Sequence, residues 1–124
     1  MDRLVLIGIA GATGALTRYG IQGAVTEALG RPTVLGTLLI NVSGAFLLGL
    51  LLALIDERGS IPLYWRPIIA TGFLGAYTTF STLMYESFNR FEAGDLATAG
   101  ANLVASVALG LLATYLGLTL GRSL

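Results

Sequence analysis

The sequence predicts an all-α integral membrane protein with four membrane-spanning helices. Its charged residues are few, seven basic and seven acidic among 124, and they gather in short clusters. Long uncharged runs separate these clusters, and each run is close to or above the ~20 residues that a helix needs to cross the hydrocarbon of a bilayer. Only short connections remain between the runs. Residues 1–124 are therefore expected to form a single transmembrane domain without a soluble part.

Charged residues define the ends of each predicted span. The first span runs from about Leu4 to Leu29, because the apolar pattern continues past Arg18. The other three are the uncharged runs Pro32–Ile55, Pro67–Tyr85 and Leu96–Gly121. A removable signal peptide starts with a basic stretch, whereas this chain starts Met-Asp-Arg and enters a full-length span. The first helix is therefore expected to be permanent.

Several chemically active residue types are missing. The chain has no cysteine, histidine or lysine, which excludes thiolate nucleophiles, imidazole bases, Schiff-base chemistry and soft metal sites. Its buried residues offer no nucleophile paired with a base, so an enzyme is not expected. No carboxylate lies well inside a span, although proton-coupled transporters usually need one there. This absence favours a passive route over a pump.

The arginine distribution bears on orientation and assembly. An even number of spans puts both termini on one side, with Arg3, Arg58, Arg66 and Arg122. Arg31, Arg90 and, depending on its depth, Arg18 lie on the other side. This difference is small under the positive-inside rule. Either the loop arginines decide one orientation, or the chain inserts both ways and forms an antiparallel dimer with its two-fold axis in the membrane plane.

Small residues recur along the second and fourth spans at spacings that let helices approach closely. We interpret them as packing positions, because glycine and other small residues are common where membrane helices meet. They are Gly36, Gly44, Gly110, Thr114, Gly117 and Gly121. A four-helix bundle normally fills its core with side chains and leaves no channel. A transport path would therefore need at least two subunits.

Glycines and hydroxyls interrupt the third span over residues 72–82. Glycine weakens a helix, and threonine hydroxyls bond backbone carbonyls, so a local break around Gly75–Thr79 is one prediction. A break frees carbonyls, which bind alkali cations, and amides, which favour anions. A kinked but continuous helix whose hydroxyls bond to its own backbone is the other interpretation.

Other spans carry isolated polar residues. Thr37 and Asn41 lie one turn apart on one face of the second span, where the Asn41 amide either donates to an anion or bonds another helix. In the fourth span Ser106 belongs to a polar stripe with Asn102, which either lines a path or cements packing. Arg18 has no acid within one turn, and in an aqueous vestibule it would concentrate anions.

Three ordered motifs resemble the Fluc/CrcB family of small fluoride channels. The first is Gly-Phe-Leu-Gly at 72–75 followed by Thr-Thr-Phe-Ser-Thr at 78–82. The second is Gly-Ala-Thr-Gly-Ala at 11–15 leading to Arg18 and Tyr19, and the third is Gly-Thr-Leu-Leu-Ile-Asn at 36–41 leading to two further glycines. The resemblance extends over all four predicted spans.

This resemblance implies a dual-topology antiparallel dimer with two fluoride pores in the plasma membrane of a bacterium or archaeon. Such a channel conducts passively and lowers cytoplasmic fluoride. A central sodium ion would be held by carbonyls of the broken third helix, at Gly75 and Thr78. Residues matching the anion pathway are Asn41, Phe80, Ser81 and Thr82, and Arg18 matches a vestibule arginine.

The chain departs from the family pattern at two positions. Leu83 stands where a second phenylalanine is usual, so one aromatic contact to the anion is missing. This difference has three alternative consequences: slower conduction, help from another aromatic residue such as Tyr77, or pairing with a paralogous subunit instead of a homodimer. Ala76 replaces a frequent glycine. Two other functions remain open: a small multidrug-resistance type exporter, which relies on a glutamate that the first span lacks, and a nonconducting structural subunit.

Overall fold

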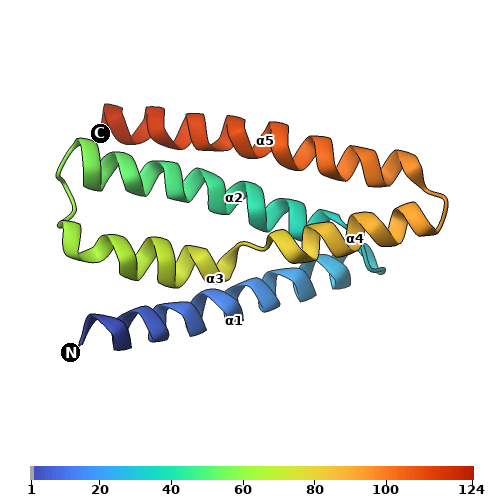
Figure 1. Cartoon of the computed structure of the whole chain (residues 1–124), viewed down its shortest axis with the longest axis horizontal. Coiled ribbons are helices and arrows are strands. Elements are labelled where there is room, and N and C mark those ends of the chain that lie inside the picture. Colours follow the sequence, from blue (N-terminus) through green and yellow to red (C-terminus); the bar gives the residue numbers. More distant parts are fainter. Residues whose placement is uncertain (1) are drawn as a thin grey trace.

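The computed structural model describes residues 2–124 and contains no strand within them. Its helical segments lie side by side, with both chain ends at one end of the bundle (Figure 1). In chain order they are α1 (Arg3–Leu29), α2 (Leu35–Leu52), η1 (Ala53–Glu57), η2 (Leu63–Trp65), η3 (Pro67–Leu74), α3 (Gly75–Tyr77), α4 (Phe80–Glu92) and α5 (Leu96–Ser123). The all-α prediction is confirmed.

Helix α1 is continuous through Arg18 and has defined caps at both ends. Asp2 caps its start by accepting a 3.1 Å hydrogen bond from the Leu4 amide. Gly30 ends it in the left-handed conformation at φ 68°, where its amide bonds the Glu27 carbonyl. Glycine adopts this conformation without the steric cost that a side chain adds. With 27 residues α1 is about 40 Å long.

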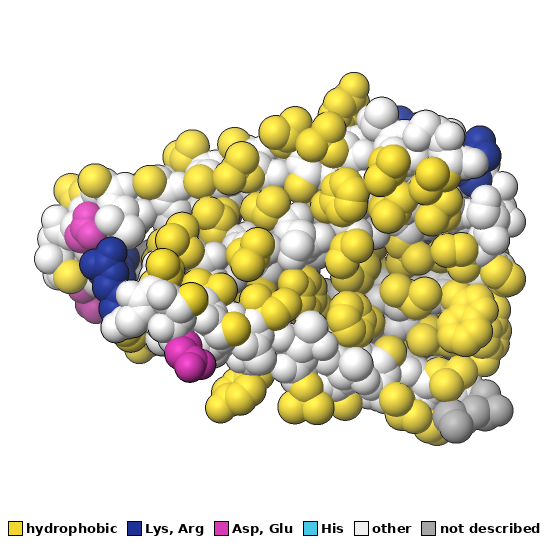
Figure 2. Space-filling view, turned by 180° about the vertical axis from the view of Figure 1, so that it is seen from behind, with side chains coloured by type: hydrophobic (Ala, Val, Ile, Leu, Met, Phe, Trp, Pro, Cys, Tyr) yellow, Lys and Arg dark blue, Asp and Glu magenta, His cyan; other side chains and the backbone are white. Residues whose placement is uncertain are grey.

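Three helices are long and apolar enough to cross a membrane by length and composition: α1, α2 continued by η1, and α5. Figure 2 shows one face of the molecule, on which charged side chains lie at the two ends and hydrophobic side chains cover the region between them. Large apolar residues such as Leu4, Leu16 and Leu111 are more than two-thirds exposed. These features are those of a multi-pass membrane protein.

The region predicted as the third span is divided. Residues 67–74 form the π-helix η3, which α3 continues to Tyr77. Thr78 and Thr79 then have extended backbone, with φ/ψ of −84°/158° and −150°/112°. The amphipathic helix α4 follows and runs to Glu92, seven residues beyond the predicted end at Tyr85.

Glycines bring α2 and α5 into backbone contact. A Cβ atom built on Gly117 would lie 2.1 Å from the Phe46 carbonyl oxygen, and one on Gly49 would lie 2.5 Å from the Thr114 carbonyl oxygen. A Cβ on Gly121 would lie 2.6 Å from the Ala53 side chain, whereas one on Gly110 meets nothing within 4 Å. The packing interpretation is therefore confirmed at Gly117 and Gly121.

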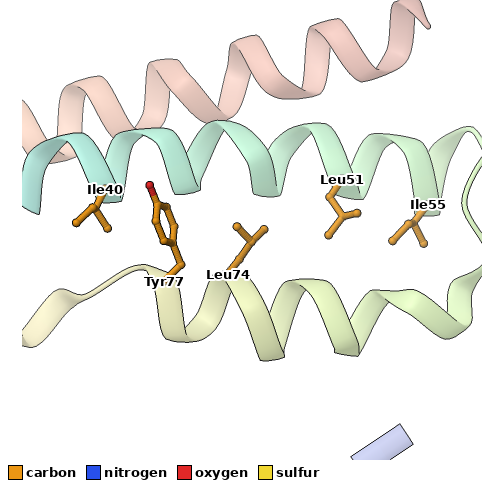
Figure 3. Close-up of a cluster of buried hydrophobic side chains, with 5 residues drawn as sticks. All are labelled: Ile40, Leu51, Ile55, Leu74 and Tyr77. Carbon is orange, nitrogen blue, oxygen red and sulfur yellow. The ribbon is translucent and has the colours of Figure 1, made fainter. Parts of the chain in front are cut away.

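A cluster of buried apolar side chains joins α2 and η1 to η3 and α3 (Figure 3). Its members are Ile40, Leu51, Ile55, Leu74 and Tyr77. This cluster holds the third helical region against α2 on the side that precedes Thr78. The extended residues are therefore placed at the end of a packed core.

Candidate ion pathway

Asn41 of α2 bonds both polar groups of the Thr79 backbone. Its Nδ2 donates to the Thr79 carbonyl oxygen at 3.0 Å, and its Oδ1 accepts from the Thr79 amide at 2.8 Å. An amide side chain can satisfy a donor and an acceptor at once, and one hydrogen of its NH₂ group is left over. The Asn41 side chain thereby replaces the helical hydrogen bonds of Thr79 and stabilises its extended backbone.

Among the backbone carbonyls that lose their helical donors at this point are those of Gly75 and Thr78. In an uninterrupted helix the Thr79 amide would bond the Gly75 carbonyl, and the Thr82 amide would bond the Thr78 carbonyl. Here the Thr79 amide bonds Asn41, and the Thr82 amide bonds the Thr79 hydroxyl at 3.3 Å. The carbonyls of Gly75 and Thr78 are consequently available to another ligand.

The available oxygens suit a hard monovalent cation. Protein sites replace the water around alkali cations with backbone carbonyl oxygens. Within residues 2–124 no group of three or more acidic side chains could hold a metal ion, and the sequence has no histidine or cysteine. The ligands present at this point are therefore neutral main-chain and hydroxyl oxygens.

Helix α4 begins with a set of hydroxyls. Thr79 caps α4, and its Oγ1 also donates to the Thr82 hydroxyl at 2.9 Å. The Ser81 hydroxyl lies 3.4 Å from the same Thr79 oxygen and is exposed. Phe80 follows the extended pair directly, and 73% of its surface is exposed in the single chain. The aromatic ring thus projects from the turn that carries the hydroxyls.

A groove of about 380 Å³ runs beside the extended residues. Asn41 and Gly44 of α2 line it, as does Ser106 of α5. The residues at the interruption that line it are Gly75, Thr78, Thr79 and Phe80. The Ser106 hydroxyl is buried and has no hydrogen-bond partner among the described residues. The structure therefore brings Asn41, Phe80, Ser106 and the two candidate carbonyls to one groove.

Thr37 lies one turn from Asn41 but does not line the groove. It is 1% exposed, and its hydroxyl donates to Glu86 Oε1 at 2.9 Å. Gln22 Nε2 of α1 donates to the same Thr37 oxygen at 3.3 Å. The Thr37 hydroxyl thus joins α1, α2 and α4, and its hydrogen is already in use.

The comparisons with known proteins cover nearly the whole chain. The model of a family described as "CrcB-like protein, Camphor Resistance (CrcB)" matches residues 5–118. The chain belongs to the CrcB family. A protein of Acidobacterium capsulatum, named fluoride-specific ion channel FluC, is 43% identical over 116 residues, which are 94% of this chain and 93% of that protein.

Further CrcB relatives share the same name and length. A fluoride-specific ion channel FluC of Magnetococcus marinus is 41% identical over 120 residues, 97% of this chain and 98% of that protein. The one from Geobacter sp. (strain M21) is 40% identical over 124 residues, all of both chains. The resemblance inferred from the three motifs is therefore confirmed at the level of the family.

Arg18 of the CrcB chain lies away from the groove. It is half-buried on α1 and is not among the groove-lining residues. Within residues 2–124, ion pairs join Arg66 to Asp56 and Arg122 to Glu57, and none involves Arg18. A role for Arg18 as an anion attractor in a vestibule stays a prediction.

Leu83 and Tyr77 are the two positions that bear on the second aromatic contact to the anion. Leu83, at the place of the usual second phenylalanine, is 7% exposed and lines the groove. Tyr77 is 5% exposed, belongs to the core cluster and does not line the groove. Its ring therefore does not replace the missing aromatic contact within this single chain.

Sequence reasoning missed the partners of the polar residues. The predicted third span ends at Tyr85, directly before Glu86, and the sequence pattern indicates no partner for Glu86, Gln22 or Ser87. Ser87 is buried and accepts a 2.9 Å hydrogen bond from Asn102 Nδ2, which cements α4 to α5. Nothing in the sequence pairs residues of separate helices, so spacing along one helix could not identify these contacts.

Proposed function

We propose that this chain forms a fluoride-selective passive channel, as its FluC relatives are named. The observation that carries the proposal is the groove in which Asn41, Phe80 and Ser106 meet without a fixed positive charge. Fluoride is small and strongly hydrated, so a pathway must offer several donors as its water is removed. A full cation at the constriction would hold the ion too strongly.

Each groove residue offers a different positive group. Asn41 keeps one amide hydrogen after bonding Thr79, and the Ser106 hydroxyl has no partner in the described chain. The edge of the Phe80 ring carries the positive part of the aromatic quadrupole. Ser81 and Thr82 do not line the groove, and they add hydroxyls beside it at the start of α4. Thr37 contributes at the next turn by fixing Glu86, and Arg18 attracts anions toward the mouth.

The proposal includes an antiparallel homodimer. We treat residues 67–85, which comprise η3, α3 and the start of α4, as one broken span, which together with α1, α2 with η1, and α5 makes four spans. Both termini then lie on one side, and the arginine balance permits insertion in either orientation. The exposed Phe80 and the open groove would face the second subunit. The proposal also places the channel in the plasma membrane, where a passive fluoride path would lower the cytoplasmic fluoride concentration.

A sodium ion at the dimer axis is part of the same proposal. The carbonyls of Gly75 and Thr78, doubled by a two-fold axis, would provide four oxygen ligands. The diverted amides of Thr79 and Thr82 support this assignment, since they leave both carbonyls without helical donors. When bound, such an ion supplies positive charge beside the two anion pathways.

Fluoride efflux from liposomes tests the function. The purified chain is reconstituted alone in vesicles loaded with fluoride, and a fluoride electrode follows efflux while chloride is measured in parallel. Rapid efflux of fluoride without chloride is expected. No efflux from the chain alone would contradict a self-sufficient homodimer and would leave a paralogous partner or a nonconducting subunit. Flux that requires a proton gradient would instead indicate an exporter.

Two phenylalanines of α4 provide the matched pair of variants. Phe80→Leu should lower fluoride efflux by about tenfold or more, the loss that accompanies ~1.4 kcal/mol of anion stabilisation. Phe88→Leu alters a ring that is also exposed but does not line the groove, and it should conduct as the unmodified chain does. Equal effects of the two variants would remove Phe80 from the pathway.

A further inference from the structure

A second contact with α2 holds the residue that comes directly before the extended pair Thr78 and Thr79. Tyr77, the last residue of α3, has its hydroxyl 2.9 Å from the Ser43 hydroxyl of α2. Its ring stacks on Phe73 with 5.8 Å between centroids and an interplanar angle of 15°. Figure 3 shows the ring rising from the end of α3 toward α2, beside Ile40 and Leu74.

The direction of this hydrogen bond follows from its neighbours. Ser43 has one hydroxyl hydrogen, and it donates that hydrogen to the Ile40 carbonyl at 3.1 Å. The Tyr77 hydroxyl must therefore be the donor and Ser43 the acceptor. Tyr77 is 5% exposed, so an unpaired phenol here would carry the cost of a buried polar group.

Gly44 allows the close approach that this contact needs. A Cβ atom at Gly44 would lie 2.3 Å from Thr78 Cγ2 and 3.3 Å from the Tyr77 ring. The three α2 residues Asn41, Ser43 and Gly44 thus contact Thr79, Tyr77 and Thr78, respectively. One turn of α2 therefore supports every residue at the interruption.

We propose that Tyr77 and Ser43 are positioning residues for the cation site, an inference that rests on the proposed function. The Tyr77 bond holds the residue before Thr78, and the Asn41 bonds hold the residue after it. The Thr78 carbonyl lies between these two anchors, and the Gly75 carbonyl belongs to the same short helix as Tyr77, two residues before the first anchor. Loss of the first anchor frees the last turn of α3 to rotate, which moves both carbonyls.

Removal of the phenol alone tests this assignment. Tyr77→Phe keeps the ring and its packing on Phe73 but loses the bond to Ser43. Tyr115→Phe is the matched control, because Tyr115 is 62% exposed and its hydroxyl makes no hydrogen bond among the described residues. The measured quantity is the sodium concentration at half-saturation of the site, obtained by fitting the logarithmic rise of Tm with sodium concentration for the purified protein in detergent, with N-methylglucamine replacing sodium.

Tyr77→Phe should raise this half-saturating sodium concentration by about three- to tenfold, the range expected for one net hydrogen bond. The rate of fluoride efflux at saturating sodium should change by a smaller factor than the sodium concentration at half-saturation. Tyr115→Phe should leave the sodium midpoint unchanged. A merely structural role would lower Tm at all sodium concentrations without moving the midpoint, and that result would overturn the inference.

Ser43→Ala gives an independent test if Tyr77→Phe does not fold. It removes the acceptor, so it should raise the midpoint by a similar factor, and the double variant should add little to either single change. Additive effects in the double variant would contradict a shared contact. If the Tm of the unmodified protein did not change with sodium concentration, both the cation site and this inference would be contradicted. The channel function would still be tested separately by fluoride efflux.

Discussion

The hydroxyl of Thr37 donates a 2.9 Å hydrogen bond to Oε1 of Glu86, and this contact joins α2 to α4 one turn from Asn41. The other carboxylate oxygen of Glu86 is buried and has no partner among the described residues. Among residues 2–124, the Glu86 carboxylate therefore receives its side-chain hydrogen bond from Thr37 alone. The stability of the α2–α4 contact should be sensitive to the Thr37 hydroxyl.

Thr37→Val should lower the free energy of unfolding by about 1–3 kcal/mol, because it leaves the Glu86 carboxylate without its donor. SDS-induced unfolding in mixed micelles measures this loss. Thr119→Val is the control, since the Thr119 hydroxyl is exposed and bonds the Tyr115 carbonyl of its own helix. The control should stay within about 0.5 kcal/mol of the unmodified chain. Equal losses of unfolding free energy in the two variants would show that the Thr37–Glu86 hydrogen bond does not contribute to stability.

Asn41→Asp should suppress fluoride efflux. The carboxylate still accepts from the Thr79 amide, but it faces the Thr79 carbonyl without a hydrogen to donate, and it places negative charge on the groove. A lost charge-assisted contact of about 1–3 kcal/mol corresponds to roughly 5- to 150-fold in rate. Liposomal efflux at one protein density measures the change.

Asn89→Asp supplies the comparison for Asn41→Asp. Asn89 is exposed on α4 and does not line the groove, so the same change of charge should leave efflux within about twofold, as expected of a surface position. A folded Asn41→Asp protein that conducts normally would remove Asn41 from the pathway. Gel filtration of both variants establishes that they are folded.

The limits of the helices could largely be predicted from charge and glycine. α1 spans Arg3–Leu29 where Leu4–Leu29 was expected, because Asp2 caps its start and Gly30 takes a left-handed conformation at its end. α4 continues past the predicted Tyr85 limit to Glu92. A span predicted from apolar composition ends at the first charge, whereas an amphipathic helix such as α4 continues beyond it.

The π-helical turns and the partners of the polar residues could not be predicted in the same way. Residues 53–57 and 67–74 are π-helical, and their sequences show no period that separates them from α-helix. The one-turn spacing of Thr37 and Asn41 predicted a shared face. It did not show that Asn41 bonds Thr79 while Thr37 bonds Glu86, because those contacts arise when separate helices pack.

Gly117→Ala should destabilise the α2–α5 contact. The added methyl would lie 2.1 Å from the Phe46 carbonyl oxygen, so the helices must separate. Overpacking of this kind costs about 1–3 kcal/mol, measured by SDS-induced unfolding. Gly20→Ala meets nothing within 4 Å and should be neutral or stabilise by up to ~1 kcal/mol, since alanine favours helix. A stable Gly117→Ala protein would contradict the close packing.

Asp95 should make the start of α5 sensitive to acid. Its carboxylate caps α5 through the Thr98 amide at 3.1 Å, and hydrogen bonding to the Thr98 side chain and amide, with a smaller effect of Arg90, lowers the pKa of Asp95. A group whose pKa is lowered in the folded state stabilises that state above its unfolded pKa, ~3.9 for aspartate. This contribution is lost as the pH falls through the folded pKa.

Asp95→Asn isolates this effect, because asparagine also caps helices but does not titrate. The unmodified chain should have the higher Tm at pH 7, and the difference in Tm should shrink as the pH falls below ~3.9. Thermal unfolding of both proteins in detergent from pH 7 to pH 3 measures it. Other carboxylates titrate equally in the two proteins and cancel in the difference. A constant difference across that range would show that the charge of Asp95 does not contribute to the stability of α5.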